Sequence, residues 1–221
     1  MTEAEWLTST DLLRMVAPPL LHPVWGPETT ADMARTERKR VLCCVAWLRS
    51  VWTLLVSEHS RKCVEVAEKH VDGEATDGEF EEALWMAKDA GDEFPEAEAG
   101  QIWATAAAYD IGGLTETVRW LVLCADEAGQ PTGGRKLLAA VLRDVFGNPF
   151  RLVTLNPDWL TPTVVTLAEG IYSDRAYDRL PILADALQDA GCDNDDMLDH
   201  CRGPGPHVGG CWVVDLLLNK G

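Results

Sequence analysis

Apolar side chains recur at steps of three and four residues along most of the chain, and this spacing predicts α-helices. The pattern is clearest between residues 41 and 56, where we expect the end of a long helix. A further helix is expected to begin at a cap formed by Ser57 or Ser60 and to end at residues 72–73, an Asp-Gly pair. The first half of the chain is therefore predicted to be helical.

Two stretches interrupt this pattern. Residues 17–30 hold four prolines and a glycine, which predicts a connector. Residues 148–162 hold three prolines, and we expect an extended segment there with Trp159 packed against the helices. Pro162 directly after Thr161 predicts a new helix start, because proline is favoured at the first helical position. The pattern predicts further helices in residues 3–17, 74–110 (two helices), 112–129, 133–147, 175–191 and 192–220 (a final pair).

These elements predict an all-α protein. No strands alternate with the helices, which argues against a parallel sheet, and no fixed-period repeat indicates a solenoid. We expect residues 1–221 to form a single helical domain, an orthogonal array of about nine or ten helices with one extended proline-rich segment. The alternative is a sub-division into residues 1–130 and 131–221.

The chain is strongly acidic, with a formal net charge of −17 over 221 residues. This charge opposes binding to nucleic acid or to an anionic membrane surface. Residues 65–98 alone contain thirteen acids and two bases. Such a segment is either a solvated helical face or a surface for a basic protein partner, with Glu79, Glu81 and Glu82 as the candidate contacts.

Seven cysteines cannot all pair within one chain. The first residues are acidic and polar, unlike a signal peptide, and charges break every apolar run well before about 18 residues. We therefore expect a cytoplasmic protein with free thiols. The nine tryptophans are expected to anchor helix packing, or alternatively to line a ligand pocket.

The chain contains no nucleophile-elbow, zinc-protease or dinucleotide-binding motif. Residues 129–137 have the glycine spacing of a phosphate loop, but Arg135 stands where that loop requires lysine. The sequence assigns no catalytic residue, and we expect a protein that is not an enzyme.

A cluster of cysteine and histidine near the carboxyl end is the one candidate for metal chemistry. Zinc prefers such sulfur and nitrogen ligands in a tetrahedron. His207 and Cys211 are four residues apart and would share one face of a helix. Asp196 and Asp215 would lie on the same helical stripes and add oxygen ligands. The candidate metal ligands are Cys192, His200, Cys201, His207 and Cys211.

The same cluster also fits a tight turn between two helices, and both interpretations stay open. Asp193 would cap the first helix, while Cys201 and Cys211 would fall on apolar faces and belong to the core. No pair of cysteines has the two-residue spacing that usually indicates a zinc site.

Three blocks of sequence resemble an uncharacterised family of bacterial proteins that is abundant in planctomycetes. They are "MTEAEWL", the block from "RDVFGNPFR" to "WLTPTVV", and the block from "PILADAL" through "GCDN" and "HCRGPGPHV" to "GCWVVDLLL". The resemblance implies a cytoplasmic protein whose role is unknown, and it implies no site residues.

Three functions follow as hypotheses. The first is an acidic, non-catalytic interaction module of the adaptor, inhibitor or immunity type, which needs no cofactor. The second is a metal-binding protein or metal-dependent enzyme that uses the cysteine and histidine cluster, with zinc as the metal. The third is a small-molecule binder with a tryptophan-lined pocket.

Overall fold

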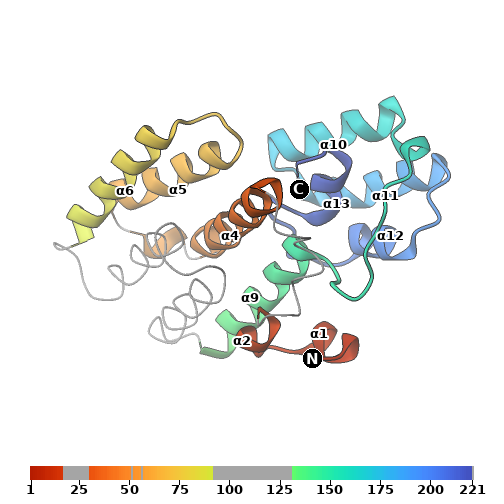
Figure 1. Ribbon diagram of the computed structural model, residues 1–221, viewed down its shortest axis with the longest axis horizontal. Helices are drawn as coiled ribbons and strands as arrows, with labels where there is room; N and C mark the ends of the chain where they lie inside the picture. Colours follow the sequence, from red (N-terminus) through yellow and green to blue (C-terminus); the bar gives the residue numbers. More distant parts are fainter. Residues whose placement is uncertain (17–29, 51, 56, 92–130, 221) are drawn as a thin grey trace. The chain divides into compact units, whose positions relative to one another are not determined.

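A computed structural model describes residues 1–16, 30–50, 52–55, 57–91 and 131–220. The described residues form ten α-helices and three short 3₁₀ helices and contain no β-strand (Figure 1), so the all-α prediction is confirmed. The helices predicted at 112–129 and the second helix of 74–110 lie outside the described residues. The chain divides into two compact units, Met1–Ala139 and Ala140–Gly221. The expectation of a single domain stays a prediction.

The first unit begins with two short helices, α1 (Glu3–Thr8) and α2 (Leu12–Met15). A capping box starts α1, in which the Thr2 hydroxyl accepts from the backbone N–H of Glu5 and the Glu5 carboxylate accepts from the backbone N–H of Thr2. Trp6 is fully buried, which fits the expected role of tryptophan as a packing anchor.

The expected long helix is α4 (Thr30–Ser50), which is followed by the 3₁₀ helix η1 (Trp52–Leu54). The helix ends earlier than the apolar pattern indicates. The sequence that follows it, Val51-Trp52-Thr53, consists of β-branched and aromatic residues that are weak helix formers. The Arg49 guanidinium lies 4.1 Å from the centre of the Trp52 ring and holds this turn against the end of α4.

Helices α5 (Glu58–Val71) and α6 (Asp77–Gly91) form a helical hairpin. Ser57 caps α5, as predicted, by accepting from the backbone N–H of Ser60 at 3.3 Å. Arg49 binds both carboxylate oxygens of Glu68, at 2.9 and 2.6 Å, and so ties α4 to α5. None of the described helices is long and apolar enough to cross a membrane.

The second unit holds the extended segment and five helices or parts of helices. Helix α9 (Pro131–Phe146) enters it, and α10 (Pro162–Asp174) begins with Thr161 as the predicted cap and Pro162 in the first turn. Between them, the segment contains only the 3₁₀ helix η2 (Pro157–Trp159), and Trp159 is buried as predicted. The 3₁₀ helix η3 (Tyr177–Arg179) and helices α11 (Leu180–Asp189), α12 (Asp195–Arg202) and α13 (Trp212–Leu217) complete the unit.

One close approach joins the end of α9 to the start of α13. Gly147 follows α9 with a φ of +69°, a backbone conformation that favours glycine. A Cβ atom on Gly147 would lie 3.2 Å from Cγ of Trp212. The glycine therefore lets the Trp212 ring lie against the backbone just after α9, and this contact brings the last turn of α9 close to α12 and α13.

Candidate metal centre

Four side chains of the second unit bring ligand atoms to one place. They are Asp144, His200, His207 and Cys211, and one nitrogen, oxygen or sulfur atom of each lies within 4.8 Å of the others. They come from α9, from α12, from the loop after α12 and from the residue before α13. The four side chains form a group that could hold a metal ion.

Asp144 lies in the last turn of α9 and is 2% exposed. Its Oδ2 accepts the backbone N–H of Val208 at 2.9 Å. Its Oδ1 lies 2.7 Å from Nδ1 of His207 and 3.1 Å from Nε2 of His200. One carboxylate oxygen is thus oriented by the backbone, and the other points at both histidines.

His200 lies in α12, which starts at Asn194, whose side chain accepts from the backbone N–H of Met197 at 2.9 Å. Nε2 of His200 also lies 3.2 Å from Sγ of Cys211. The Trp212 ring packs beside the imidazole, with 5.3 Å between ring centres. The carboxylate and the thiol therefore approach the same nitrogen of His200.

His207 lies in the loop between α12 and α13, and its ring meets the His200 ring at a steep angle with 4.9 Å between centres. While Nδ1 faces Asp144, Nε2 lies 3.3 Å from the carbonyl oxygen of Gly203 and can donate its proton there. Histidines that bind metals usually donate their second ring N–H to a carbonyl or carboxylate, which orients the ring and fixes its tautomer. The Gly203 carbonyl takes that position here.

Cys211 directly precedes α13 and is fully buried. Burial, with a smaller effect from the negative charge of Asp144, raises the pKa of its thiol well above the ordinary value. The backbone amides of Val213 and Val214 act against this rise. Without a cation beside it, Cys211 is therefore a neutral thiol.

In the absence of a metal, Asp144 and His207 each shift the pKa of the other toward its charged form. Burial raises the pKa of Asp144, but the hydrogen bonds and positive charges of His200 and His207 together outweigh it and leave that pKa lowered. Burial lowers the pKa of His207, yet the hydrogen bond to Asp144 and its charge, with the Gly203 carbonyl, outweigh it and raise that pKa. Both shifts favour a proton on Nδ1 of His207, between the ring and Oδ1 of Asp144.

The arrangement does not suit cysteine nucleophilic catalysis. In a catalytic triad the nucleophile and the orienting carboxylate bind opposite nitrogens of the histidine ring. Here Asp144 Oδ1 and Cys211 Sγ both contact Nε2 of His200. The thiol is also buried and neutral, whereas a nucleophile must be an accessible thiolate. Convergence of several donor atoms on one point is instead the geometry that a cation requires.

Three of the five candidate ligands from the sequence lie in this group, and two do not. Cys192 and Cys201 are buried in the hydrophobic core of the second unit as free thiols. Burial is the main cause that raises the pKa of both, to about 12 for Cys201. Asp196 instead forms an ion pair with Arg151 at 3.3 Å, and Asp215 is buried on α13.

Two local predictions for this region are wrong. His207 and Cys211 do not share a helical face, because α13 starts only at Trp212 and the preceding residues, which include two glycines, form a loop. The cap of α12 is Asn194 and not Asp193. The side chains of His207 and Cys211 come together because Asp144 binds His207 and the Val208 N–H, while Cys211 contacts His200. Sequence reasoning missed that aspartate.

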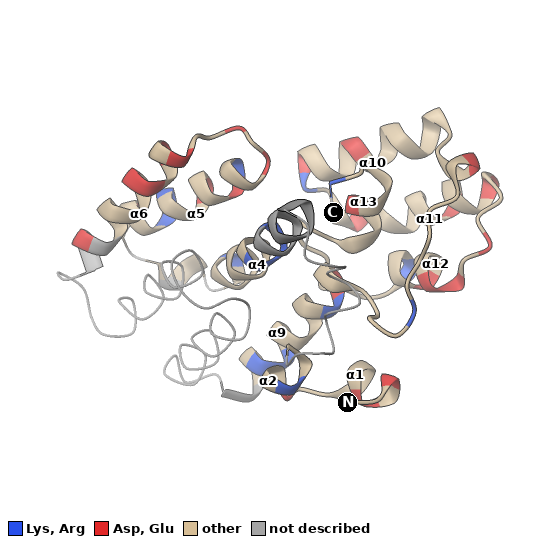
Figure 2. Ribbon diagram, viewed as in Figure 1, with Lys and Arg blue, Asp and Glu red and all other residues tan. Residues whose placement is uncertain are grey.

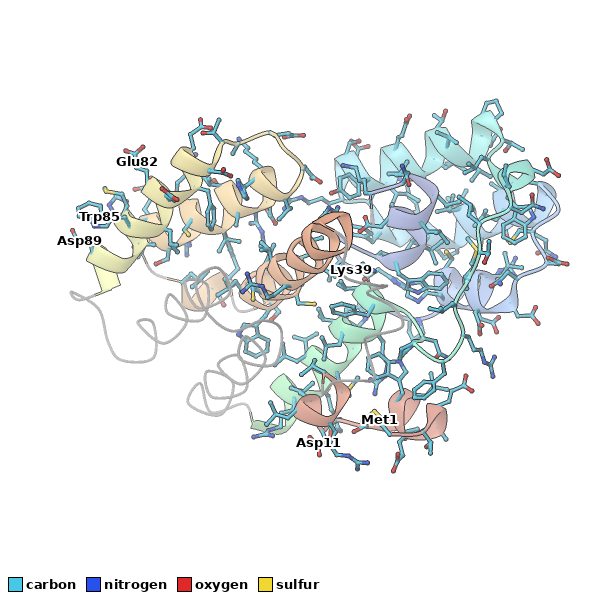
Figure 3. All side chains as sticks on the ribbon, in the orientation of Figure 1. Met1, Asp11, Lys39, Glu82, Trp85 and Asp89 are labelled. Atoms are coloured by element: carbon cyan, nitrogen blue, oxygen red, sulfur yellow. The ribbon has the colours of Figure 1, made fainter. Side chains whose placement is uncertain are left out.

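The candidate partner contacts Glu79, Glu81 and Glu82 are exposed on α6, where acidic side chains dominate (Figure 2). Trp85, 61% exposed, lies on the same helix with Glu82 and Asp89 (Figure 3). The Glu79 carboxylate, however, binds the hydroxyl and the backbone N–H of Thr76, both at 2.8 Å. Glu79 therefore caps α6, while partner binding by this face stays a prediction.

No protein-family model, curated protein or solved structure matches this chain. Function is therefore inferred from the geometry of the four side chains.

Proposed function

We propose that the protein binds one zinc ion through Asp144, His200, His207 and Cys211, and that the ion has a structural role. The observation that carries the proposal is the convergence of four ligand atoms from distant parts of the second unit within 4.8 Å of one another. Zinc accepts this mixture of sulfur, nitrogen and oxygen ligands, whereas calcium and magnesium bind oxygen almost exclusively.

The spacing of the ligand atoms is close to that of a tetrahedral zinc site and would fit it after small adjustments. Zinc bonds of about 2.0–2.3 Å place neighbouring ligand atoms roughly 3.3–3.7 Å apart. The contacts of Asp144 Oδ1 and of Cys211 Sγ with the histidine nitrogens are 2.7–3.2 Å. These three contacts would lengthen by about 0.5 Å, and the other pairs of ligand atoms, which lie within 4.8 Å of one another, would adjust toward the same spacing. The ion would replace the protons that these atoms now share.

A structural role is supported by the number and burial of the ligands. Four protein ligands fill a tetrahedron and leave no position for a substrate or a reactive water, unlike the three protein ligands of catalytic sites. Asp144 and Cys211 are buried, and the His200 and His207 side chains are only 17% and 11% exposed. The ion would hold the end of α9, α12 and the start of α13 together.

Metal analysis of the full-length protein tests the proposal. We expect one zinc per chain after purification, and one binding event in a zinc titration after treatment with a chelator. Asp144→Asn and His200→Asn should bind zinc at least about 100-fold more weakly. Asp196→Asn and His59→Asn remove the same chemical groups elsewhere and should bind normally. Stoichiometric zinc in Asp144→Asn, or none in the wild type, would contradict the proposal.

A further inference from the structure

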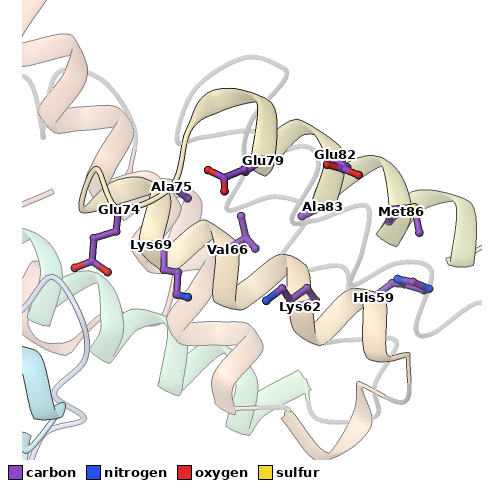
Figure 4. A pocket seen from close by; sticks show the side chains of 10 residues that line it. All are labelled: His59, Lys62, Val66, Lys69, Glu74, Ala75, Glu79, Glu82, Ala83 and Met86. Carbon is purple, nitrogen blue, oxygen red and sulfur yellow. The ribbon is translucent and has the colours of Figure 1, made fainter.

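A groove runs between α5 and α6 in the first unit, far along the chain from the metal centre. Its volume is about 370 Å³, within the range of about 300–1,000 Å³ that is usual for small-molecule sites. Figure 4 shows the lining side chains, which come from both helices and the turn that joins them. They are His59, Lys62, Val66, Lys69, Glu74, Ala75, Glu79, Glu82, Ala83 and Met86.

The α5 side of the groove is cationic. Lys62 and Lys69 are seven residues apart, so they lie on one helical face, and Val66 lies between them. Neither ammonium group forms an ion pair with the residues that the structure describes, although the charge of Lys69 helps to lower the pKa of Glu79. Two positive charges therefore line this side without a direct ion pair to a described carboxylate.

The α6 side is anionic. Glu79 and Glu82 are three residues apart on α6, and Glu74 precedes the helix in the turn. Glu79 uses one oxygen, Oε2, in the cap of α6, while the carboxylates of Glu74 and Glu82 form no ion pair or hydrogen bond with the described residues. Positive charges on α5 and negative charges on α6 and the turn thus line the same groove (Figure 4), and none of the described residues closes it with a direct ion pair.

The rest of the lining is apolar and small. Val66, Ala75 and Ala83 leave room between the two charged rows, and Met86 adds a flexible side chain that adapts to irregular ligands. A simple anion in this groove would be repelled by the glutamates, and a simple cation by the lysines. A molecule with both charges would satisfy both sides at once.

We propose that the groove between α5 and α6 binds a small zwitterion, with its carboxylate toward Lys62 and Lys69 and its ammonium group toward Glu82. Free amino acids and short peptides both have this chemistry. The proposal does not depend on the metal centre, because all lining residues lie in the first unit.

Titrations of the full-length protein with glycine, diglycine and triglycine, followed by NMR, test the proposal. We expect the amide signals of Val66 and Ala83 to shift with at least one of them at a dissociation constant of about 1 mM or below. The shortest peptide that binds distinguishes a free amino acid from a peptide. N-acetylated and C-amidated forms of that ligand should each bind at least about 10-fold more weakly, since each lacks one charge.

Matched substitutions assign the two sides. Lys62→Gln combined with Lys69→Gln, and separately Glu82→Gln, should each weaken binding at least about 10-fold. Lys136→Gln and Glu81→Gln remove exposed charges outside the groove and should leave binding unchanged. No shift with any of the three zwitterions, equal binding of the blocked forms, or normal binding by the groove variants would overturn the proposal.

Discussion

Nδ1 of His207 lies 2.7 Å from Oδ1 of Asp144, although 63 residues separate the two along the chain. The same carboxylate binds the backbone N–H of Val208 through its other oxygen at 2.9 Å. One buried side chain of α9 therefore positions both the ring and the backbone of the loop that leads to Cys211. This relationship makes the metal centre also a tertiary contact of the metal-free protein.

Removal of the Asp144 carboxylate should destabilise the protein even without metal. Asp144→Ala leaves His200, His207 and the Val208 amide without their common partner. Breaking a buried ion pair in this way typically costs about 3–5 kcal/mol. Urea unfolding in the presence of a chelator measures the change, and Asp158→Ala, an exposed aspartate, should cost less than about 0.5 kcal/mol. Equal stability of the two variants would show that the contact between Asp144 and His207 does not contribute to the free energy of unfolding.

The stability of the metal-free protein should depend on pH through the same pair. The lowered pKa of Asp144 contributes stability above its unfolded value of 3.8, and the contribution is lost as pH falls through the folded pKa. The raised pKa of His207 contributes stability below its unfolded value of 6.5, and the contribution is lost as pH rises through the folded pKa. Between these values both contributions are present.

The measurement compares wild type with His207→Gln in chelator between about pH 5 and pH 9. The free energies of unfolding should differ most near the acid end and converge as pH rises. The stabilisation that zinc adds to the wild type should change in the opposite direction, because protons compete with the metal for nitrogen and sulfur ligands. A wild-type advantage that stays constant with pH would exclude titration of His207 as its cause.

The thiol of Cys211 should be the sulfur ligand, and the two other cysteines of the second unit should not. In protein loaded with cobalt(II) in place of zinc, a thiolate ligand gives a charge-transfer absorption in the near ultraviolet. This band should disappear in Cys211→Ser and persist in Cys192→Ala and Cys201→Ala. If the band is lost in Cys201→Ala and unchanged in Cys211→Ser, the sulfur ligand is Cys201 of α12, and our assignment of Cys211 is wrong.

The sequence predicted the helices better than the metal centre. The apolar spacing and the caps at Ser57 and Thr161 identified α5 and α10, because these signals depend only on neighbouring residues. His200, His207 and Cys211 were identified by their residue types, but their expected helical stripes were wrong. The loop before α13 brings His207 and Cys211 together, and no local periodicity describes a loop.

Asp144 could not be found from the cysteine and histidine cluster, since it lies in another helix. A different signal was present in the sequence. A carboxylate three residues after Val141 falls beside the apolar face of α9, in the last helical turn, where the helix dipole disfavours a negative charge. An acidic side chain in such a position needs a positive or metal partner, and that partner is set by tertiary packing alone.

Glu79 should act on the stability of α6, in contrast to its neighbour Glu82. Its carboxylate accepts from the Thr76 backbone N–H at 2.8 Å, while the Thr76 hydroxyl accepts from the Glu79 N–H at 3.3 Å, a reciprocal helix cap. The bond to the Thr76 backbone is the main reason that the pKa of Glu79 is lowered.

Glu79→Gln keeps the shape of the side chain but removes the charge that strengthens the cap and favours a helix amino terminus. We expect a lower free energy of unfolding in Glu79→Gln and no change in Glu82→Gln, since the Glu82 carboxylate makes no such bond with the described residues. Chemical denaturation at neutral pH compares the two. Both substitutions could weaken the binding of a basic protein partner equally, while only Glu79→Gln lowers stability. In that case capping and partner binding are separate properties of one helix face. If Glu82→Gln destabilises the protein as much as Glu79→Gln does, the helix cap made by Glu79 does not contribute to stability.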